Sequence, residues 1–203
     1  RHAVNLDSSA YAVYFQLLRE HAVSEGDSVV PFEKAFAQYI GAISAVGVSS
    51  ARAGFYLTLR ALGIARGAEV IMPAYTFPSM PAAVVAAGAR PVFVDVGPGS
   101  YNLDPSLVAS AINERTKAIV VAHLFGRAAD MGKLVALASE NGIPLIEDCA
   151  HAAGALTAGG RVGSFGDAAV FSFGIGKNMP CFGGGIVTFR DRDLAGKVRK
   201  QVN

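Results

Sequence analysis

The chain has 203 residues, enough for one α/β domain with its own core, and 52% of them are hydrophobic against 17% charged. Its 18 basic and 16 acidic residues leave a net charge of +2 without any Lys/Arg-rich run, so nothing in the composition points to nucleic acid or an anionic membrane. No apolar run reaches the roughly 20 residues of a membrane helix, and no basic start leads into an apolar core as in a signal peptide.

The two cysteines, Cys149 and Cys181, form neither a CxxC pair nor a metal-ligand spacing. We therefore predict two reduced, partly buried thiols, a cytoplasmic protein and no metal site. The chain begins at Arg1 rather than Met and ends at Asn203 inside a charged helical pattern, so we expect both ends to be cut.

Two amphipathic stretches come first along the chain. One covers about Tyr11–Val23, and with it we predict an N-terminal helical segment over residues 1–25. The other covers Pro31–Tyr39, with proline at a position that a first helical turn tolerates, and stops at Gly41. Residues 26–203 are predicted to form one domain.

Seven short apolar runs follow, and helical patterns separate the first five of them. The runs are Ile43–Val48, Val70–Met72, Pro91–Val94, Ala118–Val121, Pro144–Ile146, Ala168–Phe171 and Ile186–Phe189. The helical patterns are Ala53–Leu62, Ala82–Ala87, Leu107–Ile112 and Gly132–Ser139.

The character of the runs predicts a fold class. Because they are continuously apolar rather than alternating, we expect strands that are buried on both faces. Their alternation with helices predicts a three-layer α/β/α domain around a mainly parallel seven-stranded sheet. No helical pattern lies between the sixth and seventh runs, which a tight glycine-rich turn at Gly183–Gly185 connects, so the last strand is predicted to be antiparallel.

Ligands of open α/β sheets bind beyond the carboxyl ends of the strands, so the polar residues that follow the runs are candidate site residues. After the first run, Ser50, Ala51 and Arg52 lead directly into a helix. The free backbone N–H groups and the positive dipole of a helix start suit a phosphate. An ordinary serine N-cap is the simpler alternative for Ser50.

The fifth run ends in an acidic segment that contains Asp148, Ala150 and His151. An acid at the mouth of a buried sheet is unfavourable unless it has a cationic partner, and a pyridinium nitrogen is one such partner. The alternatives are an aspartate whose carboxylate is satisfied by backbone groups and a structural, hydrogen-bonded His151.

The sixth run is followed by Ser172 and then by Lys177 in a glycine-rich turn. A lysine between two apolar strands can lose its proton more easily and attack a carbonyl group, whereas a solvated loop lysine is the alternative. Asn178 replaces the Ser/Thr of a P-loop, and no GxGxxG opens a helix after a strand. A phosphate-ready helix start, a strand-end aspartate and a serine five residues before a lysine are, in that order, typical of a pyridoxal-phosphate (PLP) site.

Further sequence blocks point to one family. They are Gly26–Glu33, Ala37–Gly41, Leu59–Ile64, Glu69–Phe77, Gly88–Val96, His123–Gly126, Ile146–Ala155 and Gly163–Lys177. From about Gly26 to its C-terminus the chain resembles the DegT/DnrJ-type PLP-dependent sugar aminotransferases, which have the aspartate-aminotransferase fold. The resemblance implies the PLP-binding large domain of that fold, without its C-terminal small domain.

The resemblance also implies a role for each candidate residue. Lys177 would hold PLP as a Schiff base and then act as the acid and base that moves the proton. Asp148 would pair with the pyridine nitrogen, and His151 stands near the ring hydroxyl, where the family often has glutamine. Phe77 and Ala150 would pack against the two faces of the cofactor ring. The phosphate would be held by Ser50, Ser172 and the backbone amides of Ala51 and Arg52.

The reaction that the resemblance implies moves an amino group from an amino acid, glutamate in most of the family, to a keto-sugar that is usually nucleotide-linked. The family shares its sites between two subunits, so a homodimer is expected. Two segments depart from the family pattern. Ser50-Ala51-Arg52 stands where Ser-Gly-Thr is usual, and the turn Asn178–Gly183 differs from the common Thr/Gly-rich version.

Three other functions remain open at this point. A PLP-type sugar dehydratase usually carries histidine at the lysine position, so Lys177 argues against it. A truncated or non-catalytic paralogue would bind PLP or a partner without turnover. A desulfurase or lyase of the same fold would be expected to place a cysteine in a mobile loop, and neither Cys149 nor Cys181 lies in an evident one.

Overall fold

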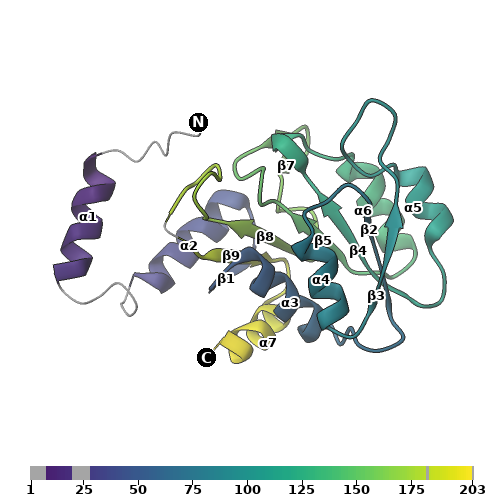
Figure 1. The fold of residues 1–203 in the computed structure, drawn as a ribbon, viewed down its shortest axis with the longest axis horizontal. Helices are drawn as coiled ribbons and strands as arrows, with labels where there is room; N and C mark the ends of the chain where they lie inside the picture. The colour runs from purple at the N-terminus through teal and green to yellow at the C-terminus, as the bar shows by residue number, and fades with distance from the viewer. Residues whose placement is uncertain (1–7, 20–27, 182, 203) are drawn as a thin grey trace.

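The structure is a computed structural model, and it describes residues 8–19, 28–181 and 183–202. Its main sheet has seven strands: β1 (Ser44–Val48), β2 (Glu69–Pro73), β3 (Arg90–Val94), β4 (Thr116–Ala122), β5 (Leu145–Asp148), β8 (Ala168–Ser172) and β9 (Gly185–Phe189). The helices are α1 (Ser8–Arg19), α2 (Val29–Ile40), α3 (Ala51–Ala61), α4 (Ser79–Ala86), α5 (Pro105–Ala111), α6 (Met131–Glu140) and α7 (Arg192–Val202). Figure 1 shows how they are arranged.

The strand order is β1-β9-β8-β5-β4-β2-β3. β9 runs antiparallel to both of its neighbours, with Val187 opposite Val46 on β1 and Val170 on β8, whereas the other neighbouring pairs are parallel. The prediction of a mainly parallel seven-stranded sheet with an antiparallel last strand is therefore confirmed. The connection between β8 and β9 is longer than the predicted tight turn, because it extends from Phe173 to Gly184.

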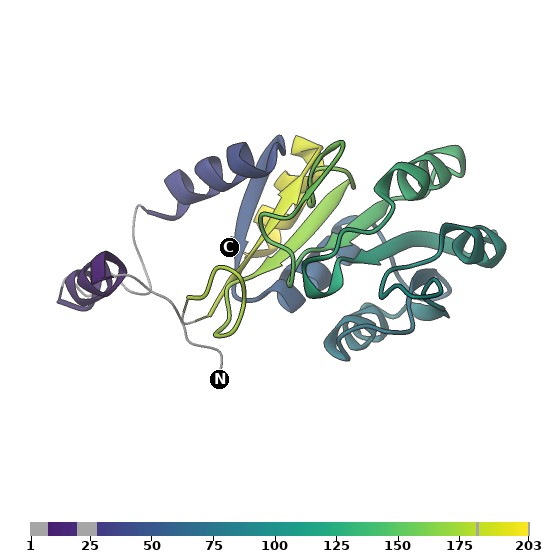
Figure 2. The same ribbon diagram turned by 90° about the horizontal axis from the view of Figure 1, so that it is seen from above.

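Helices cover both faces of the sheet, as Figure 2 shows from above. On β4, Ala118 and Val120 face the core beneath α3, α4 and α7, while Ile119 and Val121 face the core beneath α5 and α6. A third apolar cluster lies between α2 and the sheet. The runs predicted to be buried on both faces are thus buried because alternate residues enter separate cores.

One predicted strand differs from this pattern. β3 lies at the edge of the sheet and pairs only with β2, so Phe93 is 53% exposed rather than buried. Helix α4 also begins three residues before the predicted Ala82, because its start is set by the turn at Pro78 and Ser79. A short hairpin of β6 (Leu156–Thr157) and β7 (Gly160–Arg161) was not predicted, since two-residue strands leave no apolar period in the sequence.

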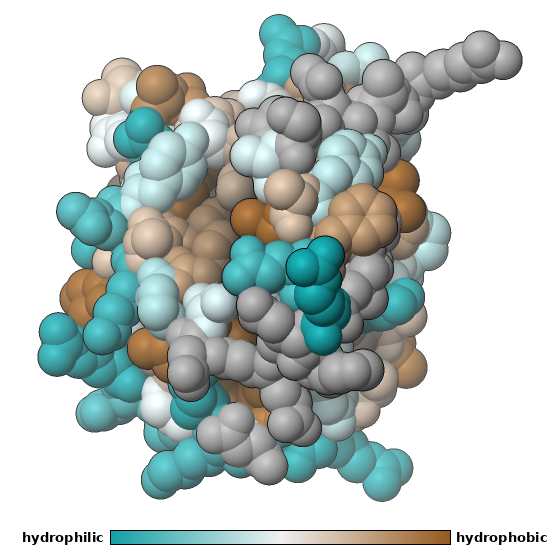
Figure 3. Space-filling model, turned by 90° about the vertical axis from the view of Figure 1, so that its left-hand side faces the viewer, coloured by the Kyte–Doolittle hydropathy of each residue, from teal (hydrophilic) through white to brown (hydrophobic). Residues whose placement is uncertain are grey.

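The N-terminal helix α1 covers the first part of the predicted stretch Tyr11–Val23, and the rest of that stretch and the boundary at residue 26 lie outside the described residues. Figure 1 shows α1 apart from the sheet, and Figure 3 shows apolar surface on this side of the molecule. Among the described residues, the exposed large apolar side chains of α1 and α2 are Tyr11, Val13, Phe15, Val29, Val30, Phe32 and Tyr39. In the described parts of the chain, the helices are all too short or too polar to cross a membrane.

Candidate active site

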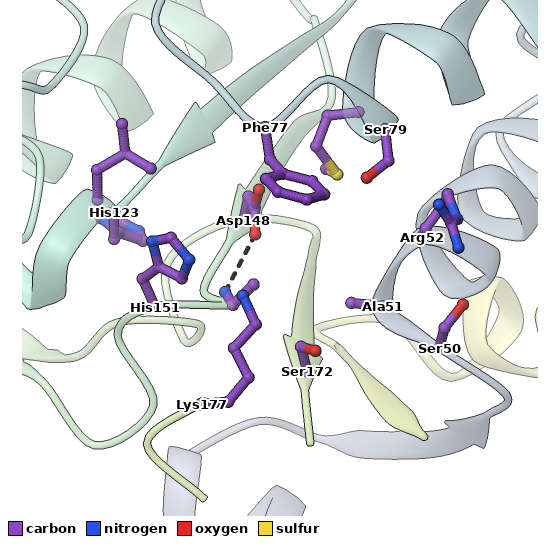
Figure 4. A pocket seen from close by; sticks show the side chains of 13 residues that line it. Ser50, Ala51, Arg52, Phe77, Ser79, His123, Asp148, His151, Ser172 and Lys177 are labelled. Carbon is purple, nitrogen blue, oxygen red and sulfur yellow. Dashed lines mark hydrogen bonds between the residues drawn. The ribbon is translucent and has the colours of Figure 1, made fainter. Parts of the chain in front are cut away.

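The nine residues singled out from the sequence all line one pocket, at the carboxyl ends of the parallel strands (Figure 4). They are Ser50, Ala51, Arg52, Phe77, Asp148, Ala150, His151, Ser172 and Lys177. The pocket also contains four residues that were not predicted, namely Ser79, Met80, His123 and Leu124. Ser79 is the first residue of α4, three residues before the predicted helix start, so the sequence carried no clear signal for it.

The topology explains why these distant residues meet. The connection after β1 carries Ser50, the connection after β2 carries Phe77, and β5 ends at Asp148. Because β1, β2, β4, β5 and β8 all run in one direction, their carboxyl ends lie along one edge of the sheet. His123 directly follows β4 and Ser172 ends β8, so both reach the same edge.

One end of the pocket is built to receive an anion. Ser50 is the N-cap of α3 and its hydroxyl accepts the N–H of Ala53 at 3.2 Å, so the prediction of an ordinary serine N-cap is confirmed. The N–H groups of Ala51 and Arg52 lie in the first turn, where a helix offers them no carbonyl partner. Figure 4 shows Ser50 and Arg52 on one side of the pocket and His151 and Lys177 on the other.

Close packing of glycine holds the start of α3 at this place. A Cβ atom on Gly185 would lie 2.5 Å from the Ala51 nitrogen and 2.7 Å from the Phe171 carbonyl oxygen. A Cβ atom on Gly54 would lie 2.5 Å from a methyl group of Val187. Only glycine therefore lets α3 approach β9 and β8 so closely, and this approach sets where the first-turn amides lie.

Asp148 is a buried carboxylate, with 8% of the residue exposed. Its Oδ1 accepts the N–H of Ala150 at 3.0 Å, the interaction dashed in Figure 4, and within the described residues it forms no ion pair. Burial raises its pKa above the ordinary value, and the Ala150 N–H and the charges of His151 and Lys177 oppose that rise. A cation bound beside Asp148 would therefore be strongly favoured.

His151 lies beside this carboxylate and is partly buried. Burial lowers its pKa below the ordinary value, the positive charge of Lys177 lowers it further, and Asp148 works in the opposite direction. These effects favour the neutral form of His151, in which one ring nitrogen can donate a hydrogen bond and the other can accept one.

Lys177 is held in the connection between β8 and β9. Its backbone N–H donates to the carbonyl oxygen of Gly174 at 3.1 Å. The preceding Gly176 has a φ of +92°, a conformation that favours glycine. Its side-chain nitrogen lies 5.9 Å from the centre of the Phe77 ring. The amine and the ring thus face one another in the pocket, and Lys177 is partly buried there.

A buried network supports the strand ends beneath the pocket. The Nε2 atom of His123 lies 2.9 Å from Glu147, and its Nδ1 accepts the N–H of Ala129 at 3.1 Å, so the ring proton is on Nε2. Both carboxylate oxygens of Glu147 accept further N–H groups, from Gly163, Phe165 and Gly166, at 2.7 to 2.9 Å. The network fixes the orientation of the His123 ring, which forms part of the pocket wall.

The two cysteines are free thiols. Cys149 is buried next to Glu147 and His123, whereas Cys181 is exposed, so only Cys149 matches the expected burial. Burial raises the pKa of the Cys149 thiol well above its ordinary value, and the charges of Glu147 and Asp148 raise it further. The thiol of Cys149 is thus held in its neutral form.

The chain matches a known protein family over most of its length. The sequence model of the DegT/DnrJ/EryC1/StrS aminotransferase family matches residues 6–203. The chain is 41% identical over 177 residues to the spore coat polysaccharide biosynthesis protein SpsC of Bacillus subtilis, covering 87% of this chain and 46% of that protein. It is 44% identical over 175 residues to dTDP-3-amino-3,4,6-trideoxy-alpha-D-glucose transaminase of Streptomyces venezuelae, covering 86% and 46%.

Solved structures have the same fold. DesV of S. venezuelae, solved in complex with a ketimine intermediate, superposes with a TM-score of 0.85 at 40% identity, covering 93% of this chain and 54% of that one. NtdA of B. subtilis, solved with bound cofactor PMP, gives a TM-score of 0.86 at 30% identity, covering 93% and 42%. The chain therefore spans about half the length of the relatives that it matches.

Proposed function

Because this chain belongs to the DegT/DnrJ/EryC1/StrS aminotransferase family, we propose that its pocket binds pyridoxal 5′-phosphate and serves amino-group transfer from an amino acid to a keto-sugar. One observation carries the proposal. The buried carboxylate of Asp148, which has no ion-pair partner among the described residues, shares this pocket with the amine of Lys177.

The residues of the pocket fit the cofactor at three points. Asp148 offers a negative charge to a protonated pyridine nitrogen. The first-turn amides of α3, with the hydroxyls of Ser50 and Ser172, offer hydrogen-bond donors to the phosphate. Lys177 offers an amine to the aldehyde group. Figure 4 shows Ser50 on the side of the pocket away from Lys177, which is compatible with a cofactor whose phosphate and aldehyde lie at opposite ends.

When bound, the cofactor supplies an electron-withdrawing ring that stabilises negative charge at the α-carbon of the amino acid. Asp148 would keep the proton on the pyridine nitrogen. The Nζ atom of Lys177 would take the proton from the α-carbon of the amino acid and deliver it to the C4′ atom of the cofactor. Phe77 and Ala150 hold the ring from its two sides, and the neutral His151 is available to the ring hydroxyl.

The substrates and the assembly are part of the proposal. We take glutamate as the amino donor and a nucleotide-linked keto-sugar as the acceptor. Similarity to a dTDP-amino-sugar transaminase and to a polysaccharide biosynthesis protein supports a sugar acceptor. We further propose that residues 26–203 form the cofactor-binding domain and that a cytoplasmic homodimer shares its sites. The Phe77 ring is 60% exposed, so it has surface left for a second subunit to cover.

The test of transfer is a single-turnover reaction. Protein loaded with PLP is mixed with glutamate, glutamine or aspartate, and both the visible absorbance and the released 2-oxo acid are measured. We expect glutamate to abolish the absorbance and to release one equivalent of 2-oxoglutarate per site, while the variant Lys177→Ala releases none. A loaded protein that responds to no amino acid would instead be a PLP-binding paralogue without turnover.

A further inference from the structure

Three aromatic side chains form an exposed cluster outside the pocket. The ring centres of Tyr75 and Tyr101 lie 5.8 Å apart, those of Tyr101 and Phe125 lie 5.0 Å apart, and those of Tyr75 and Phe125 lie 6.4 Å apart. The three rings come from different connections, after β2, β3 and β4. Each residue is about half exposed, so a substantial part of each ring surface is available to a ligand.

This aromatic cluster adjoins the candidate active site through His151. The ring of Phe125 lies 6.1 Å from the imidazole of His151, with an angle of 33° between the two planes. His151 itself lines the pocket that contains Lys177. A substrate whose reacting group is at Lys177 would therefore extend past His151 and Phe125 toward Tyr101 and Tyr75.

Hydrogen bonds join the backbone segments around the aromatic cluster. The side-chain amide of Asn102 donates to the carbonyl oxygens of Arg127 at 3.2 Å and of Ala128 at 2.9 Å, which joins the connection after β3 to the turn after β4. Phe125 has φ 55° and ψ 27°, a left-handed conformation that is uncommon outside glycine. Backbone strain of this kind is concentrated at functional sites, where it fixes the position of a side chain before a ligand binds.

The chemistry of the cluster suits a flat ring. It consists of two tyrosines and a phenylalanine that are each about half exposed, and the side-chain amide of the adjacent Asn102 already donates to backbone carbonyl oxygens. Aromatic faces bind nucleobases by stacking. Arg127 follows Phe125 by two positions, is exposed and, within the described chain, forms no ion pair. Its guanidinium group suits a phosphate.

We propose that the cluster of Tyr75, Tyr101 and Phe125 binds the nucleobase of a nucleoside-diphosphate sugar, with Arg127 contacting the diphosphate. This inference rests on the proposed function, since it assigns the carrier end of the same substrate. It differs from that proposal in naming the side chains that recognise the carrier. A second copy of the chain is the competing occupant of these exposed rings.

The test measures binding to the PLP-loaded protein by calorimetry, with UDP, dTDP, GDP and inorganic pyrophosphate as probes. We expect at least one nucleotide to bind about tenfold or more tightly than pyrophosphate. Stacking on an aromatic side chain contributes about 1–3 kcal/mol per base. Phe125→Leu and Tyr101→Leu should therefore each lower the affinity for that nucleotide by about 5- to 150-fold and leave the affinity for pyrophosphate unchanged. Arg127→Gln should lower the affinity for the nucleotide and for pyrophosphate alike.

The matched control is Phe93→Leu, which changes an equally exposed phenylalanine on the edge strand β3 and should bind every probe as wild type does. The inference is overturned if nucleotides bind no better than pyrophosphate, or if the two leucine variants retain wild-type nucleotide affinity. Analytical sedimentation of the same variants tests the competing occupant, a second copy of the chain. A variant that no longer self-associates but keeps its nucleotide affinity would show that the cluster is a subunit contact. The PLP absorbance of each sample reports separately on the proposed function.

Discussion

The side-chain nitrogen of Lys177 lies 5.9 Å from the centre of the Phe77 ring. Lys177 comes from the connection between β8 and β9, and Phe77 from the connection after β2, so the sheet order β8-β5-β4-β2 brings them to one pocket. A cation within about 6 Å of a ring face is attracted to it. This pair defines the space in which the amine, the ring and the carboxylate of Asp148 can act on one ligand.

Replacing Phe77 by alanine should weaken PLP binding with little effect on the fold. The ring is 60% exposed, so we expect the free energy of unfolding to change by less than about 0.5 kcal/mol. Loss of ring stacking should lower the affinity for PLP by about 2- to 13-fold, which corresponds to about 0.5–1.5 kcal/mol of binding free energy. Fluorescence titration with PLP measures the effect. Phe93→Ala removes a ring of similar exposure outside the pocket, and equal PLP affinities of the two variants would contradict the stacking role.

Asp148→Asn should separate cofactor binding from stability. A charge-assisted hydrogen bond contributes about 1.5–3 kcal/mol, so the variant should bind PLP about 10- to 150-fold more weakly. Burial raises the pKa of Asp148, and the folded chain therefore holds the proton more tightly than the unfolded chain does. Stability of the unliganded protein consequently falls as pH rises from the ordinary pKa of 3.8 to the raised value, and it does not recover above that value.

We therefore expect Asp148→Asn to stabilise the unliganded protein at pH 7. The expected gain in the free energy of unfolding is about 1 kcal/mol, which is typical when a functional residue that lowers stability is replaced. Asparagine can still accept the N–H of Ala150 through its side-chain oxygen. Urea denaturation without PLP measures this effect. A variant that is less stable than wild type at pH 7, or that binds PLP equally well, would contradict the assignment.

Gly185→Ala should destabilise the protein and weaken phosphate binding together. The new Cβ atom would lie within 2.8 Å of backbone atoms of Ser50, Ala51 and Phe171, none of which can move without shifting α3 or β8. Overpacking of this kind costs about 1–3 kcal/mol. The control is Gly196→Ala in α7, where nothing lies within 4 Å of the added atom and a gain of about 0.5–1 kcal/mol is expected. Similar effects of the two changes on stability would refute the packing argument.

Acid should reveal the role of Glu69 at the start of β2. Arg90, Asn113 and Arg115 bond to its carboxylate and lower its pKa from 4.5 to about 2. This depressed pKa contributes stability that is fully present above pH 4.5 and is lost as pH falls toward about 2. Denaturation curves between pH 7 and pH 3 should show a shallower acid loss for Glu69→Gln than for wild type. Glu140→Gln, at an exposed position on α6, should keep the wild-type slope.

The strands of the sheet and the pocket residues could be predicted because they leave local marks in the sequence. A continuously apolar run indicates a strand with a core on both sides. The residue after the run lies at the carboxyl end of the strand, where ligands of such sheets bind. Glu147 and Asp148 are adjacent in one such segment, and the alternation of side chains along a strand sends one into the buried network with His123 and the other to the pocket. The sequence alone did not separate their roles.

Other features depend on distant partners and could not be predicted. The exposure of Phe93 follows from strand order, because only an edge position leaves that side chain uncovered. The aromatic cluster joins residues of three connections, and no local period links Tyr75 to Phe125. The left-handed conformation of Phe125 is likewise one that its residue type does not favour, so the sequence gives no sign of it.

The most direct test of the central claim is covalent trapping of the cofactor. Purified protein is mixed with PLP, its visible absorbance is recorded, the sample is reduced with borohydride, and the labelled peptide is mapped by mass spectrometry. The account predicts a yellow protein with the label on Lys177, and a Lys177→Ala variant without that label. A folded sample that binds no PLP, or a label on a different lysine, would contradict it.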